Sequence, residues 1–156
     1  MYEISIPSSI KTIGTQSFYL CTSLLRIKFN SPSSLTSIFD NAFALCSSLV
    51  QIEIPSKVAV IGKYAFYGCS KLNIIKIPSS IKQIQKYAFF GCSKLEQIIL
   101  QQSLLHIEES SFYGCTSLKK NRNTIKYWCD WIVCFSKLHI IGKIFVSKKK
   151  KTSIGQ

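Results

Sequence analysis

The chain has 156 residues, which leaves room for one domain, and apolar residues make up 47% of it, as is ordinary for a folded protein. Its net charge is +13, although charged residues make up only 17%. We expect no clear membrane span, because the most apolar stretch of about 20 residues, 127–146, is interrupted by Asp130 and three basic residues. Met1 is followed at once by a repeated unit, so we expect no signal peptide.

The positive charge is concentrated toward the C-terminus. Residues 1–118 hold ten Lys and Arg against six Asp and Glu, a net of +4, whereas residues 119–156 hold ten against one, a net of +9. This asymmetry indicates a mildly basic body that carries a basic tail.

The body is built from a unit of 23 to 25 residues that recurs five times. Four columns of residues keep the same spacing along the chain, so chance is a poor explanation. The columns are Phe18, Phe43, Phe66, Phe89 and Phe112; Cys21, Cys46, Cys69, Cys92 and Cys115; Leu24, Leu49, Leu72, Leu95 and Leu118; and Ile13, Ile38, Ile61, Ile84 and Ile107.

The second copy is two residues longer than its neighbours, and the fifth is degraded. The surplus, Asn30-Ser31, follows the predicted strand, where a turn tolerates insertion. The fifth copy replaces Pro-Ser-Ser by Gln101-Gln102-Ser103. In chain order the copies run over about residues 4–26, 27–51, 52–74, 75–97 and 98–120.

Within a copy, alternating apolar residues up to Ile77 predict a short half-buried strand, which Pro78 ends. Residues 86–89 are compatible with a short helical or 3₁₀ turn, and Gly91 suits a position of positive φ after it. In the first two copies Leu20 and Leu45 hold the glycine place, so the turn there is expected to differ or to be more strained.

One copy cannot bury enough apolar surface to fold alone, so the copies must stack on one another. The predicted fold class is therefore an α/β-type repeat solenoid. We expect a leucine-rich repeat slab with one short parallel strand per repeat and short helical or 3₁₀ turns on the convex side. Residues 1–120 form the predicted repeat domain, and residues 121–156 a non-repeat basic tail, with a possible cap followed by a disordered end.

The pattern I-P-S-S-I-K-x-I-x-x-x-A-F-x-G-C-S-x-L resembles the BspA-like leucine-rich repeat of bacterial and protozoan surface antigens. The resemblance covers about residues 4–120. It implies a parallel right-handed solenoid that binds a protein partner, such as a host-cell or matrix protein, at the cell surface or outside the cell. The chain departs from this picture in showing no signal peptide and no clear transmembrane segment.

The cysteines invite a metal or redox interpretation, but the five in-step residues lie at least 23 apart rather than in the close pairs of metal sites. A buried column of small apolar side chains explains them better. Cys129 and Cys134 fall outside the repeat, and a disulfide, a metal role and incidental placement all remain open.

Catalytic constellations are missing from the sequence. His106 falls at a predicted turn and is expected to be solvated, and Glu108-Glu109 are adjacent and cannot share one face as an acid–base pair. No glycine-rich phosphate loop occurs. We therefore expect no enzyme and no cofactor.

A partner is expected on the concave strand face, where outward side chains of parallel strands line up. A solvated face without a partner is the alternative there. The candidate residues are Arg26, Lys28, Gln51, Glu53, Ile74, Lys76, Gln97 and Ile99.

The basic tail offers a second hypothesis, in which Lys148–Lys151 associate with an anionic membrane surface or nucleic acid. A solubilising end is the simpler explanation of these lysines, and we expect no specific nucleic-acid partner.

Overall fold

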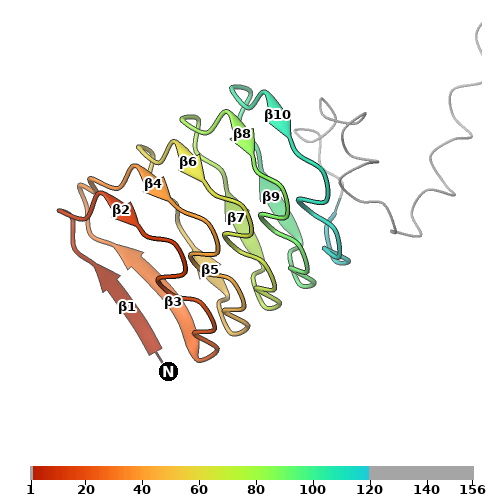
Figure 1. The fold of residues 1–156 in the computed structure, drawn as a ribbon, viewed down its shortest axis with the longest axis horizontal. Helices are drawn as coiled ribbons and strands as arrows, with labels where there is room; N and C mark the ends of the chain where they lie inside the picture. The colour runs from red at the N-terminus through yellow and green to blue at the C-terminus, as the bar shows by residue number, and fades with distance from the viewer. Residues whose placement is uncertain (1, 120–156) are drawn as a thin grey trace, which may run out of the picture.

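The computed structural model describes residues 2–119, which form a solenoid of stacked turns that follow one another in chain order (Figure 1). Each turn contributes one strand to a five-stranded parallel sheet, here called sheet A. Its strands are β1 (Tyr2–Ile6), β3 (Leu24–Phe29), β5 (Gln51–Ile52), β7 (Ile74–Lys76) and β9 (Gln97–Ile99). The stacked parallel strand predicted for every repeat is confirmed.

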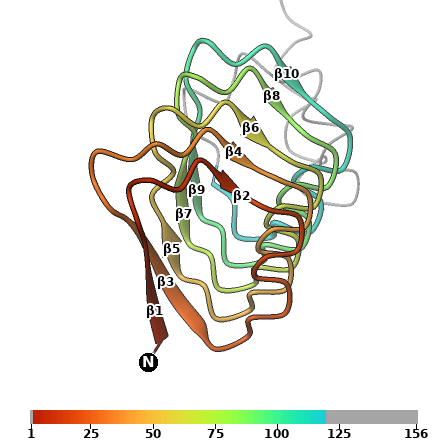
Figure 2. The ribbon, with the colours of Figure 1, turned by 60° about the vertical axis from the view of Figure 1, so that its left-hand side comes forward.

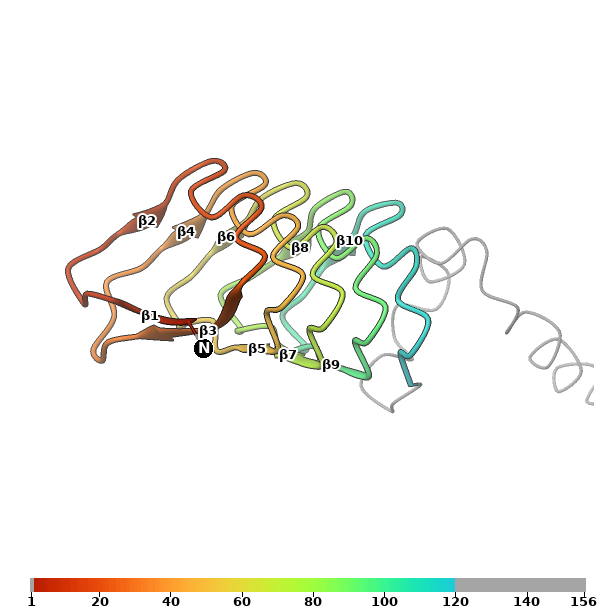
Figure 3. The same ribbon diagram turned by 90° about the horizontal axis from the view of Figure 1, so that it is seen from below.

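Each turn also carries a second strand of two residues, where the sequence predicted only one strand per repeat. These back strands are β2 (Thr12–Ile13), β4 (Ser37–Ile38), β6 (Val60–Ile61), β8 (Gln83–Ile84) and β10 (His106–Ile107). They pair in parallel as β2-β4-β6 and β8-β10. Sheet A and the back strands form separate walls of the solenoid (Figures 2 and 3). His106 therefore lies in a strand, not in the predicted turn.

The register of sheet A repeats the sequence period. Arg26 pairs with Gln51, Gln51 with Ile74, and Ile74 with Gln97. Ile27 pairs with Ile52 in the next column, and both are buried. Because equivalent residues face one another on successive strands, every column of the sequence becomes a line of side chains along the solenoid.

The predicted inward groups form one continuous core. In the fourth copy all eight of them are at most 1% exposed: Ile75, Ile77, Ile81, Ile84, Ala88, Phe89, Cys92 and Leu95. The phenylalanine column stacks from Phe18 to Phe112 with ring centroids 5.1–5.4 Å apart. Each turn thus completes the hydrophobic environment of its neighbours, as a solenoid requires.

The predicted helical turn is not confirmed, since the described residues contain no helix, and so none that could cross a membrane. The N–H of Phe66 donates to the carbonyl of Ala88 in the next turn at 2.8 Å, and the N–H of Phe89 donates to Ser111 likewise. These donors are therefore not available to the carbonyl four residues back that an α-helix needs. Residues 86–91 form tight turns instead.

The glycine column adopts the predicted left-handed backbone, with φ of 66° at Gly68, 74° at Gly91 and 78° at Gly114. Leu20 and Leu45 adopt the same conformation, with φ of 60° and 61°. Of the two expectations for these leucines, the strained turn is the one observed, because a side chain in this region is sterically unfavourable.

Candidate functional site

The outward side chains of sheet A form two rows that run across the strands. The first row contains Glu3, Arg26, Gln51, Ile74 and Gln97, which the strand register aligns one after another. The second row lies two residues further along each strand and contains Ser5, Lys28, Glu53, Lys76 and Ile99. All eight predicted partner-binding residues thus lie on one face of the sheet.

The eight predicted partner-binding residues differ little in solvent exposure. Seven of the eight are exposed, and Ile99 is partly buried. The alternation that exposes them is the strand period itself: Ile27, Ile52, Ile75 and Ile98 between them point into the core. This arrangement makes the face available to a partner without disturbing the fold.

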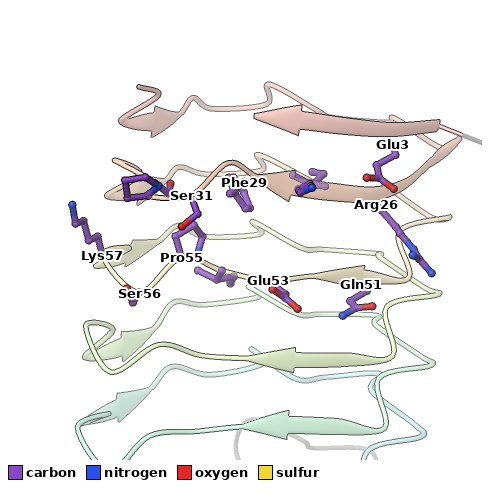
Figure 4. A pocket seen from close by; sticks show the side chains of 14 residues that line it. Glu3, Arg26, Phe29, Ser31, Gln51, Glu53, Pro55, Ser56 and Lys57 are labelled. Carbon is purple, nitrogen blue, oxygen red and sulfur yellow. The ribbon is translucent and has the colours of Figure 1, made fainter. Parts of the chain in front are cut away.

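One hollow lies over the strands β1, β3 and β5 of sheet A and has a volume of about 590 Å³. Figure 4 shows Glu3, Arg26, Gln51 and Glu53 along its strand side. The turns that follow β3 and β5 supply the opposite side, which includes Ser31, Pro55, Ser56 and Lys57 (Figure 4). The Asn30-Ser31 insertion lies after β3, as the sequence predicted, and so contributes to this wall.

A second hollow of about 750 Å³ lies over β5 and β7. Val50 and Ile74 in its lining are 38% and 44% exposed. The two residues sit on adjacent turns, where the N–H of Asn73 donates to the carbonyl of Val50 at 3.1 Å. The lining also includes Glu53 and Lys76. Two exposed apolar residues on adjacent turns therefore lie among polar and charged groups.

The charges on this face have no partner within ion-pair distance in the described part of the chain. Among residues 2–119, the ion pairs are Lys86–Glu109 and Lys119–Glu96. The hydrogen bond from Lys119 lowers the pKa of Glu96, and the hydrogen bond to Glu109 raises the pKa of Lys86. Arg26, Lys28 and Lys76 are thus free to meet charges on another molecule.

The cysteine column is buried as predicted, except that Cys21 is partly exposed. Each later thiol donates to the carbonyl of the phenylalanine one turn back, as from Cys69 to Phe43 at 3.1 Å. Burial raises the pKa of Cys46 to about 12 and that of Cys92 well above its usual range. Such thiols are poor nucleophiles, because the thiolate is the reactive form.

The remaining polar candidates have structural contacts. One carboxylate oxygen of Glu108 accepts the backbone N–H of Lys86 at 2.7 Å, while Glu109 pairs with the Lys86 ammonium. His106 is exposed, as expected. Within residues 2–119 no cluster of three or more His, Cys, Asp or Glu could hold a metal ion. Cys129 and Cys134 lie outside the described residues.

The sequence did not predict the residues that line the hollows outside the two rows. Val50 directly precedes the first row, and Ser56, Lys57 and Ser79 lie in the turns beyond the strand ends. Their positions depend on how each chain segment leaves the sheet, which strand alternation does not reveal. At the place of Val50 the available signal was variation from copy to copy, since Asn73 holds it in the next copy, whereas Ser56 and Ser79 belong to the repeated pattern and gave no signal.

Comparisons with known proteins agree on the kind of repeat. A family model described as a BspA type leucine-rich repeat region matches residues 1–119 in six copies, one more than the sequence columns define. No curated protein sequence matches significantly.

Two solved structures share the fold. A leucine-rich repeat protein of T. pallidum is 28% identical with a TM-score of 0.58, and the match covers 76% of this chain and 65% of that one. A leucine-rich cell surface protein of Faecalibacterium prausnitzii is 27% identical with a TM-score of 0.56, and the match covers 76% and 38%. The chain thus spans less than two thirds of either structure.

Proposed function

The chain belongs to the BspA-type leucine-rich repeat family, and we propose on this premise that it is a non-catalytic module that binds a protein partner through the outward face of sheet A. Repeats of this family generally serve protein interaction. The F. prausnitzii structure is described as a cell surface protein. We place this chain at the cell surface or outside the cell by analogy, with a host-cell or matrix protein as its partner.

One observation carries the proposal: Val50 and Ile74, on adjacent turns, are both exposed in the lining of the second hollow. Binding energy at protein interfaces is concentrated in a few apolar or aromatic anchors within a ring of groups that exclude water. The amides of Gln51 and Asn73 and the charges of Glu53 and Lys76 would form such a ring. Burying two β-branched side chains gives a partner affinity that a uniformly polar face does not offer.

The charged residues of the face would govern selection. Arg26, Lys28 and Glu53 lie along the first hollow with no ion pair among the described residues. Charges at such positions act mainly on the rate of association and on the choice of partner rather than on affinity. We propose that the charges of the first hollow determine which partner binds, and that the apolar residues of the second hollow supply most of the binding energy.

A photo-crosslinking residue at a single position captures a partner whatever its identity, and so tests the proposal. We would install it at position 74 and, as a matched control, at position 105, since Leu105 is 61% exposed beside the back strand β10. Exposure to a panel of matrix and host-surface proteins should give an adduct from position 74 only. Equal adducts from both positions, or none from 74, would contradict the proposal.

Substitutions supply the quantitative arm of the test. Ile74→Asp or Lys76→Glu should weaken binding of the crosslinked protein at least tenfold, because the first places a charge in the apolar centre and the second reverses a complementary charge. Leu105→Asp should leave the affinity unchanged. If changing Lys148–Lys151 to serine abolished binding instead, the basic tail would be the binding element.

A further inference from the structure

A cluster of five aromatic rings lies on the turns between the back strands and the next strand of sheet A, which stack along one edge of the solenoid (Figure 2). We call it the tyrosine ridge: Tyr64, Tyr67, Tyr87, Phe90 and Tyr113. Tyr64 stacks on Tyr87 at 4.8 Å, and Phe90 stacks on Tyr67 at 5.4 Å and on Tyr113 at 4.7 Å. Edge contacts join the two columns.

The ridge is kept at a conformational cost. Tyr64 and Tyr87 have φ of 57° and 59°, in the left-handed region that every turn adopts at this place, where the other turns carry Gln16, Asn41 and Ser110. Asparagine tolerates this region, whereas a bulky side chain is strained there. Strain of this kind persists where the surrounding structure compensates for it. All five rings are stacked and remain partly exposed.

The stacking decides what the ridge can present to a ligand. Phe90 is covered on both faces, and each of the other rings is covered on at least one. Ring edges are therefore the part of the ridge left to solvent, and an aromatic edge is the positive part of its quadrupole. A cationic ligand needs a ring face, and at Tyr87 the Lys86 ammonium already lies over the ring, so an external cation is disfavoured there. Groups rich in negatively charged oxygen suit this surface.

Lysines in the same turns also favour a negatively charged ligand. Lys63 precedes Tyr64, and Lys71 and Lys94 each follow a ring of the ridge by four residues. All three are exposed and have no ion pair among the described residues. Lys86 lies 5.1 Å from the Tyr87 ring centroid and pairs with Glu109. Exposed lysines thus lie in the same turns that carry the ridge.

We propose that the tyrosine ridge binds a linear anionic polysaccharide, bearing sulfate or carboxylate groups, that runs parallel to the solenoid axis. Equivalent rings recur every 4.7–5.4 Å along the ridge. A pyranose unit advances a linear glycan by about one such step, so successive sugars meet equivalent rings. Same-face side chains of an extended acidic peptide recur about every 6.6–6.8 Å and fall out of step within three turns.

Binding of a heparin-derived decasaccharide by the full chain tests this site apart from the strand face. Lys148–Lys151 are changed to serine throughout, so that the basic tail contributes less to every measurement. Tyr67→Ser with Tyr113→Ser should raise the dissociation constant at least tenfold, because it removes two hydroxyls and two stacks. The matched control is Tyr19→Ser, which alters the same column in the first turn, outside the ridge, and should change nothing.

A second pair of variants keeps the test decisive if the serine variant folds poorly. Tyr67→Phe with Tyr113→Phe preserves the stacks and removes the hydroxyls, and it should still weaken binding severalfold. Equal affinity in all variants would overturn the proposal. Tighter binding of a polyglutamate peptide than of the decasaccharide would also overturn it and would indicate an acidic protein as the ligand. Equally tight binding of neutral dextran would overturn it as well, because it would show that the ridge does not recognise negative charge.

Discussion

Gly91 and Gly114 hold equivalent places in the repeat but differ in the room around them, which allows the cost of the left-handed turn to be measured. An added methyl group at Gly91 would lie 3.7 Å from the Cα of Gly68, an ordinary contact. At Gly114 it would lie 3.3 Å from the Cα of Gly91, which is backbone and cannot rotate away. The φ values, 74° and 78°, are nearly the same.

Gly91→Ala should therefore lower the free energy of unfolding by about 1–2 kcal/mol, the usual cost of a side chain in left-handed backbone. Gly114→Ala should cost about 1 kcal/mol more, because a well-packed neighbour must shift. Urea unfolding followed by circular dichroism measures this. With a slope of about 1–3 kcal/mol per molar, a loss of 1 kcal/mol moves the midpoint by roughly 0.3–1 M.

Lys71→Ala serves as the control, because Lys71 is exposed and its backbone lies outside the left-handed region. It should change the unfolding free energy by no more than about 0.5 kcal/mol. If Gly91→Ala had no effect, φ would not determine which residues the glycine column accepts. If it cost more than Gly114→Ala, the clearance around the added methyl group would not determine this.

Three further results are expected. Phe66→Ala should lower the free energy of unfolding in urea by about 3–5 kcal/mol, which is more than the loss from Phe18→Ala. The reason is that Phe66 is fully buried between two rings, whereas Phe18 is partly exposed and has one stacked neighbour. Equal losses would contradict the stacked core. The raised pKa of Cys46 favours the neutral thiol in the folded state, so its contribution to stability should be complete below about pH 9 and be lost as pH rises toward 12. Cys46→Ala should remove that part of the alkaline unfolding curve, and an unchanged curve would refute it. If residues 121–156 associate with anionic membranes, binding of the full chain to phosphatidylserine vesicles should fall steeply between low and physiological salt; salt-independent binding would exclude that role.

The sequence predicted the core well because the core is periodic. Phe43, Cys69 and Ile84 are each fixed by equivalents one repeat away, and all three are fully buried. The eight residues of the strand face followed from the same alternation, and all lie on one face. Whether they bind a partner stays a prediction.

Other features could not be derived from periodicity. The back strand Gln83–Ile84 is too short to produce an alternating pattern, and its identity depends on hydrogen bonds to the adjacent turn. The tyrosine ridge was visible as rings three residues apart, at Tyr64 and Tyr67 and again at Tyr87 and Phe90. What the sequence did not reveal is that these rings stack across turns and keep their edges exposed.

The glycine column also bears on how such a chain can change in length. Between the third, fourth and fifth turns every junction sets glycine against glycine, whereas Gly68 faces Leu45 and its added methyl group would meet the leucine side chain at 2.6 Å. Duplication or loss of one 23-residue unit within the last three turns would therefore recreate a junction that already exists. The number of repeats could thus change in this part of the chain while the fold stays the same.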